Sequence, residues 1–161
     1  MSSAGAASSS TYSPLGVLRN AGLIHQVHFQ DQRTNYSIWR FQGSGQANMQ
    51  GLFMNKARPR SEANLVKTVQ LSLLSPTQTF RPTQLRTLQK AAEEVSSKCF
   101  GNDLKNLDLF LKAAVNTRAW PSVTRGKTTE ITVVPAGEGA RVTVQLDLPS
   151  TQTSQCRMPS V

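Results

Sequence analysis

Acidic side chains are scarce in this chain. Its 161 residues include 9 Asp and Glu against 18 Lys and Arg, which gives a formal net charge of +9. A small protein with such an excess repels itself unless a polyanion neutralises the charge, and nucleic acid is the usual polyanion. The imbalance predicts that the chain binds RNA or DNA.

Long apolar runs and closely spaced cysteines are also missing. No stretch approaches the roughly 20 apolar residues of a membrane-spanning helix, and the Ala- and Ser-rich start lacks the features of a secretory signal. The two cysteines, Cys99 and Cys156, lie far apart, and Cys156 falls in a polar tail. We therefore expect no membrane span, no secretion, no stabilising disulfide and a reducing, intracellular compartment.

Few residues suit metal or catalytic chemistry. His25 and His28 are three apart on one expected strand, hence on opposite faces of it, where they cannot readily hold one metal ion. Cys99 has no recognisable base, and the Gly43-Ser44-Gly45 turn lacks the Gly-Lys-Ser/Thr that completes a phosphate-binding loop. We expect no metal, no cofactor and no enzymatic activity.

Apolar residues make up 38% of the chain, a low share for a globular protein even after glycine is counted. The length suits one domain with tails, and a thin core is often completed by a second copy, so we expect a homodimer or higher oligomer. The expected organisation is a disordered tail at 1–13, a basic β-rich region at 14–61, an oligomerisation domain at 62–149 and a disordered tail at 150–161.

The first half of the chain is rich in strand-forming residues. Residues 23–30 and 35–42 predict a hairpin across a polar turn, and a short third strand is expected at 51–54. Residues 65–74 fit a strand or a helix, because their apolar positions alternate except at Lys67.

The second half predicts helices followed by a hairpin. One helix is expected from Pro82 to a stop at Gly101, and another from a cap at Asn102 or Asp103 to a stop before Trp120. Residues 129–134 and 141–148 then form a well-alternated hairpin with one apolar face. The expected class is α+β: amphipathic helices packed on antiparallel hairpins, dimeric through the carboxy-terminal half, where hairpins of two subunits pair into one sheet.

Cations and aromatic rings are interleaved in the first half. Arg40 lies between Trp39 and Phe41, so the rings could stack on unpaired bases while cations hold phosphates. The alternative is that these two rings belong to the core. No zinc-finger spacing or RNA-recognition signature is present, so we expect contacts mainly to the nucleic-acid backbone. The expected RNA-binding residues are Arg33, Tyr36, Trp39, Arg40, Phe41, Lys56, Arg58, Arg60, Arg118, Arg125 and Lys127.

Four short segments carry a family resemblance: Pro82-Thr83-Gln84-Leu85, Leu88 to Ala92, Thr129-Glu130-Ile131 and Arg141 to Val144. In them the chain resembles the carboxy-terminal part of small nidovirus nucleocapsid proteins, particularly those of toroviruses and bafiniviruses. Phe80 to Thr83, ahead of a helix and a hairpin, is also similar to the arterivirus nucleocapsid dimer domain. The resemblance implies a protein that binds and packages genomic single-stranded RNA, self-associates, and resides in the virion and the host cytoplasm.

Two other interpretations of the charge remain open. One is a cellular RNA- or DNA-binding module that forms a defined complex with a structured nucleic acid. The other is a basic structural subunit of a large ribonucleoprotein or cellular assembly, whose positive face meets acidic protein.

Overall fold

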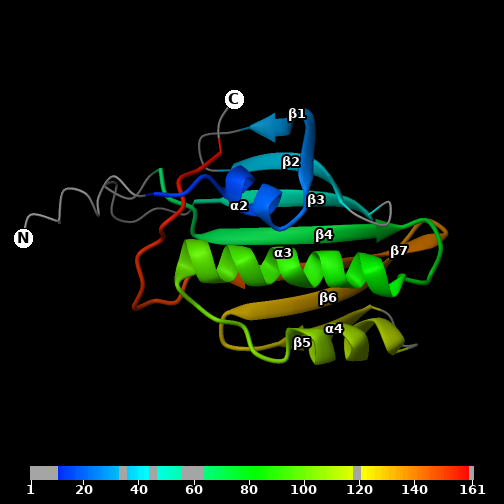
Figure 1. Cartoon of the computed structure of the whole chain (residues 1–161). Helices are drawn as coiled ribbons and strands as arrows, with labels where there is room; N and C mark the ends of the chain where they lie inside the picture. The colour runs from blue at the N-terminus through cyan, green and yellow to red at the C-terminus, as the bar shows by residue number, and fades with distance from the viewer. Residues whose placement is uncertain (1–10, 33–35, 44–46, 56–63, 118–120, 160–161) are drawn as a thin grey trace, which may run out of the picture.

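The computed structural model describes residues 11–32, 36–43, 47–55, 64–117 and 121–159 (Figure 1). Its helices are α2 (Pro14–Asn20), α3 (Pro82–Phe100) and α4 (Leu107–Asn116). Its strands are β1 (Ile24–Gln32), β2 (Tyr36–Gly43), β3 (Ala47–Met54), β4 (Thr68–Ser75), β5 (Ser122–Arg125), β6 (Thr129–Ala136) and β7 (Gly139–Asp147). The predicted α+β class is confirmed.

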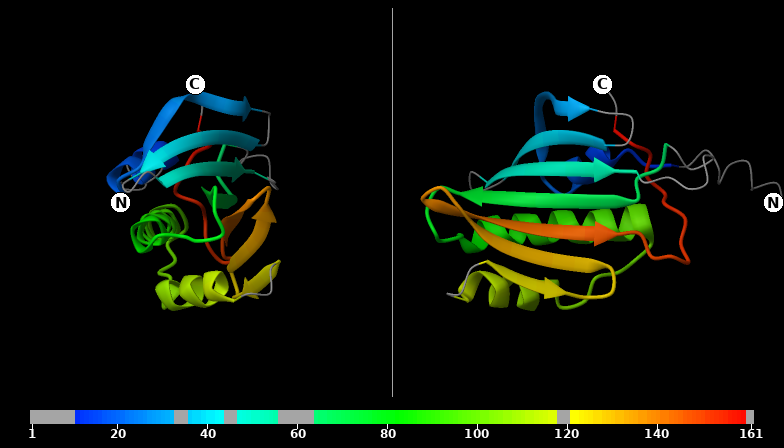
Figure 2. Two further views of the ribbon diagram at one scale, coloured as in Figure 1. Left: turned by 90° about the vertical axis from the view of Figure 1, so that its right-hand side faces the viewer. Right: turned by 180° about the vertical axis from the view of Figure 1, so that it is seen from behind.

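The strands form one antiparallel sheet in the order β1-β2-β3-β4-β7-β6-β5. The helices lie on a single face of it: α3 runs along β4 and β7, α4 crosses β5 and β6, and α2 packs beside β1 and α3 (Figure 1). Seen from the side and from behind, the opposite face carries no helix of the described chain (Figure 2). We call these the covered face and the open face.

The core lies between the helices and the covered face. In β4 the burial alternates, with Val69, Leu71 and Leu73 fully buried, and Val142 and Val144 of β7 are equally buried. Alternation with a period of two is the pattern of a strand with one face against a core. The ambiguous segment 65–74 therefore forms a strand from Thr68 onward, and each such side chain contributes roughly 1.5–3 kcal/mol by leaving water.

Helix α3 matches its predicted bounds. Pro82 occupies the first turn, the backbone N–H of Arg81 donates to Gln84 Oε1 at 3.1 Å, and Gly101 ends the helix in the left-handed region at φ 62°. Helix α4 starts later than predicted. The residue just before Leu107 is Asn106, whose backbone lies in the left-handed region at φ 60° and is therefore not helical. The predicted caps at Asn102 and Asp103 are wrong.

The predicted hairpins are present, and the third strand begins earlier than expected, at Ala47. Two short elements, α2 and β5, were not predicted. Helix α2 spans only 7 residues and β5 only 4, too few for a hydrophobic period to stand out.

The two compositional halves share one sheet. Strand β3 pairs with β4 over six residues, from Met49↔Leu73 to Met54↔Thr68, so no boundary between separate cores falls near residue 61. Strand β7 lies between β4 and β6, and β6 lies between β7 and β5. Both edges of the final hairpin are occupied within the chain, so the expected pairing of hairpins from two subunits is wrong.

The carboxy-terminal segment is ordered through residue 159, contrary to the predicted tail at 150–161. A disulfide joins Cys99, near the end of α3, to Cys156, with Cα atoms 4.8 Å apart. Main-chain bonds hold the same segment: the N–H of Val66 donates to the Cys156 carbonyl at 2.8 Å, and that of Tyr12 donates to the Gln155 carbonyl at 2.6 Å. Polar composition predicted disorder, but a covalent bond and main-chain pairing do not depend on side-chain polarity.

The disulfide removes the ground for expecting a reducing compartment, because disulfides persist mainly where the surroundings are oxidising. Among the described helices, none has both the length and the apolar character needed to cross a bilayer.

Candidate functional site

The centre of the open face is a flat, hydrophilic floor on β4 and β7. Thr68 Oγ1 donates to Asp147 Oδ1 at 2.9 Å, Gln70 Nε2 donates to Gln145 Oε1 at 2.8 Å, and the hydroxyls of Ser72 and Thr143 lie 2.8 Å apart. These cross-strand pairs form because residues opposite one another in an antiparallel ladder point to the same side. The floor therefore carries hydrogen-bonded amide and hydroxyl groups together with the carboxylate of Asp147.

A hollow of about 380 Å³ lies beside this floor. Arg40 of β2 and Arg141 of β7 line it, together with Asn48, Gln50 and Ser72. The register explains the grouping, because Arg40 is opposite Gln50, and Gln50 is opposite Ser72, across three neighbouring strands. Both arginines are exposed, and the described residues of the lining include no Asp or Glu.

The two arginines are far apart along the sheet. Strands β2 and β7 are separated by β3 and β4, which places their backbones about 14 Å apart at the usual strand spacing. A guanidinium group stays charged at any ordinary pH and binds phosphate or carboxylate through two parallel hydrogen bonds. The hollow thus suits an extended anion better than a single small one.

Other predicted cations lie elsewhere on the described surface. Arg125 forms an ion pair with Glu130, with 3.0 Å between Nε and Oε2, and its side chain is 75% exposed. Lys127 is exposed in the turn between β5 and β6. Neither lines the hollow, so the structure does not bring them together with Arg40.

Trp39 and Phe41 point to the covered face and are only 4% and 2% exposed. The indole N–H of Trp39 donates to Ser37 Oγ at 2.6 Å, and the Phe41 ring covers Gly51, where an added Cβ would lie 2.9 Å from a ring carbon. The prediction that these rings stack on bases is wrong, because the core needs them. Alternation along β2 places Tyr36 on the open side with Arg40, and Tyr36 is half-buried.

Five predicted RNA-binding residues lie outside the described residues: Arg33, Lys56, Arg58, Arg60 and Arg118. Their role stays a prediction.

Sequence reasoning missed Arg141, Asn48 and Gln50. Arg141 had a usable signal, since it directly precedes the inward-facing Val142 in an alternating strand and must therefore point outward. Its place in the same hollow as Arg40 had no such signal, because that depends on β3, β4 and β7 being neighbours in the sheet although they are distant in sequence.

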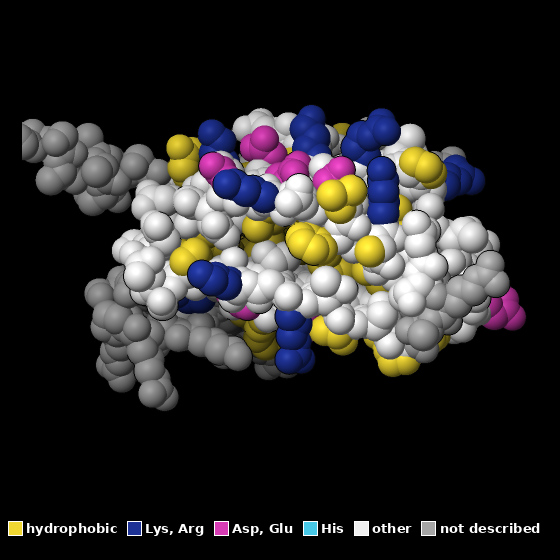
Figure 3. All heavy atoms as spheres, turned by 90° about the horizontal axis from the view of Figure 1, so that it is seen from below, with side chains coloured by type: hydrophobic (Ala, Val, Ile, Leu, Met, Phe, Trp, Pro, Cys, Tyr) yellow, Lys and Arg dark blue, Asp and Glu magenta, His cyan; other side chains and the backbone are white. Residues whose placement is uncertain are grey.

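Figure 3 views the molecule from below, at the end formed by α4 and β5, and shows Lys and Arg side chains mixed with Asp and Glu, with hydrophobic side chains exposed near the middle. On α3, for example, Lys90 is followed by Glu93 and Glu94. The described lining of the hollow on the open face includes neither Asp nor Glu, although Asp147 lies on the floor beside it.

No protein-family model matches the chain, and neither a curated protein nor a solved structure matches it. In the part of the chain that the structure describes, no three His, Cys, Asp or Glu side chains are grouped as a metal site requires.

Proposed function

We propose that this protein binds single-stranded RNA across the open face of its sheet, with Arg40 and Arg141 holding phosphates. The observation that carries the proposal is the hollow lined by these two arginines and by no described carboxylate, in a chain with a net charge of +9. Phosphate contacts supply most of the affinity in such complexes.

The polar lining of the hollow suits bases and sugars. Gln50 and Asn48 carry amide groups that donate and accept hydrogen bonds, and the hydroxyl of Ser72 does the same. A 2′-hydroxyl group can bond to such groups, which favours RNA over DNA. Trp39 and Phe41 are buried, so Tyr36 is the aromatic residue of β2 that lies on this face, and binding depends mainly on the nucleic-acid backbone and is tolerant of sequence.

More specifically, we propose that the bound RNA is a viral genome that the protein packages. The resemblance to nidovirus nucleocapsid proteins supports this function. A packaging protein also binds itself, and the sheet leaves β1 and β5 as its outer strands. The disulfide is compatible with a virion, because disulfides occur on virion surfaces.

The proposal is tested by filter binding of a single-stranded RNA of about 20 nucleotides over a salt series. We expect the double variant Arg40→Ala/Arg141→Ala to bind about tenfold more weakly than the unaltered protein. Its salt dependence, the slope of log K against log salt, should fall by about 1.4, or about 0.7 for each phosphate that is no longer neutralised.

The matched control is Lys90→Ala/Lys98→Ala, which removes the same charge from exposed positions on α3. It should stay within about threefold of the unaltered protein, because charges outside the contact surface act only through the screened long-range field. An equal loss in both double variants would show that only net charge matters and would remove the open face from the proposal.

Heparin distinguishes RNA from a sulfated polysaccharide, which offers similar anions. If the protein binds heparin but no RNA at the same ionic strength, the RNA proposal is wrong and the hollow serves sulfate groups. The triple variant Lys56→Ala/Arg58→Ala/Arg60→Ala tests the predicted cluster separately, and unchanged affinity would exclude that cluster from the site.

A further inference from the structure

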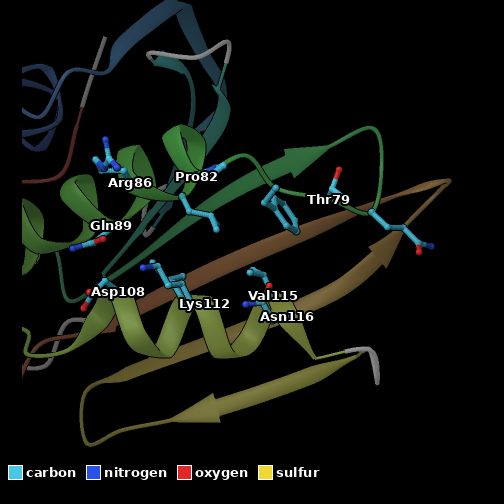
Figure 4. A pocket seen from close by; sticks show the side chains of 12 residues that line it. Thr79, Pro82, Arg86, Gln89, Asp108, Lys112, Val115 and Asn116 are labelled. Atoms are coloured by element: carbon cyan, nitrogen blue, oxygen red, sulfur yellow. The ribbon is translucent and has the colours of Figure 1, made fainter.

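A groove of about 710 Å³ runs between α3 and α4 on the covered side of the molecule, away from the open face (Figure 4). The inner part of its wall is apolar: Phe80, Leu85 and Val115 are partly buried and pack against the core, and Leu111 is 1% exposed. A hollow of this volume is within the usual range of small-molecule sites, about 300–1,000 Å³. It is too small for a folded partner.

The rim of the groove is polar and carries two cations. Arg86 is contributed by α3 and Lys112 by α4, and both are exposed. In the close view, Asp108 and Lys112 rise from α4 toward α3 (Figure 4). Neither cation forms an ion pair with a carboxylate of the described residues, and Asp108 is the only described acid in the lining. The rim therefore has one positive charge in excess.

We propose that this groove binds an amphiphile with one anionic head, such as a medium-chain fatty acid. The apolar chain lies along Phe80, Leu85 and Val115, and the carboxylate meets Lys112 at the rim with Arg86 nearby. An apolar ligand without charge would leave the rim cations unused, and a cationic one would be repelled. The proposal does not depend on RNA binding, because the groove and the two-arginine hollow lie on opposite sides of the sheet.

The test uses the full chain and decanoate as the probe, followed by isothermal titration calorimetry and by amide chemical shifts of isotope-labelled protein. We expect saturable binding of one decanoate per chain. The largest shifts should fall on Leu85, Leu111, Lys112 and Val115, while Arg40 and Arg141 stay unchanged. Absence of binding below the micellar range of decanoate, or shifts centred elsewhere, would overturn the proposal.

Reversing the charge of Lys112 tests whether this residue holds the head group of the ligand. Lys112→Glu should weaken decanoate binding about tenfold and strengthen binding of decyltrimethylammonium, because the same chain would then carry the complementary charge. Lys98→Glu, also on an exposed residue but outside the groove lining, is the matched control and should change neither affinity by more than about twofold. Equal effects of the two variants would show that net charge, and not the groove, governs binding.

A milder variant is needed in case the Lys112→Glu protein does not fold. Lys112→Gln removes the charge but keeps a polar side chain that is one atom shorter, and it should weaken decanoate binding by about threefold to fivefold, with an unchanged far-UV circular dichroism spectrum. If Lys112→Gln folds normally and binds decanoate as tightly as the unaltered protein, Lys112 does not hold the head group and the proposal fails.

Discussion

The two faces of this sheet are built from the same strands but differ in burial and in chemistry. Along β4, Leu71 points to the helices and is fully buried, whereas its neighbour Gln70 points to the open side and is hydrogen-bonded across to β7. The covered face supplies stability through apolar burial. The open face adds little stability, so its amides, hydroxyls and arginines can be selected for binding. Changes on one face should therefore leave the property of the other intact.

Substitutions at two adjacent residues of β2 should show the largest difference between the two faces. Phe41→Ala empties a fully packed position over Gly51 and should lower the free energy of unfolding by about 3–5 kcal/mol. Arg40→Ala should lower it by less than about 1 kcal/mol but weaken RNA binding several-fold. Urea unfolding and filter binding measure the two effects, and a Phe41→Ala protein that stays as stable as the unaltered one would refute the burial argument.

The disulfide is the next largest contribution and belongs to the covered side. Cys99→Ser/Cys156→Ser opens a link between residues 57 apart and should lower the free energy of unfolding by about 2–4 kcal/mol. Thermal unfolding with and without a reductant provides the measurement. The reductant should shift the unaltered protein and have no effect on the double variant; a shift in both would point to a cause other than this bond.

The polar pairs of the open face should matter less. Gln145→Ala removes the partner of Gln70, a half-buried pair, and we expect a loss of about 0.5–1.5 kcal/mol. The double variant Gln70→Ala/Gln145→Ala should lose no more than the single one, since neither polar partner is then left alone. A double-mutant cycle in urea tests this, and strictly additive losses would contradict pairing across the strands.

The smallest effect should come from the ion pair at the sheet edge. Arg125 is 75% exposed on its side chain, and exposed pairs contribute about 0–1 kcal/mol, screened further by salt. Arg125→Ala should therefore change the unfolding midpoint only slightly at low salt and not at all in about 1 M salt. A loss that persists in high salt would indicate packing of the aliphatic stem instead.

Much of the local structure could be anticipated. The spacing of Leu88, Ala92 and Val95 behind Pro82 specifies α3, and the alternation from Val142 to Leu146 specifies β7, because each pattern has the period of its own element. Alternation along β2 also carries a signal against a shared role in binding: Trp39 and Phe41 share one face and Arg40 the other, so the rings and the cation between them could not all meet one ligand.

The candidate site was only half foreseen. Arg40 was expected to touch phosphate and lines the hollow, whereas Arg141 was not expected at all. Their approach requires β7 to insert between β4 and β6, a pairing of segments about seventy residues apart that no local pattern encodes. The same holds for Cys99 and Cys156, whose bond depends on the carboxy-terminal segment passing the end of α3.

Composition and short-range periodicity alone established the excess of positive charge, the α+β class, and the inward or outward direction of most strand residues, since these depend on residues a few positions apart. Tertiary structure alone decided which strands are neighbours, which side the helices cover, and hence which arginines share a hollow and which rings are buried. The physical reason is that burial and long-range pairing are properties of the assembled chain, in which each apolar face is satisfied by segments distant in sequence.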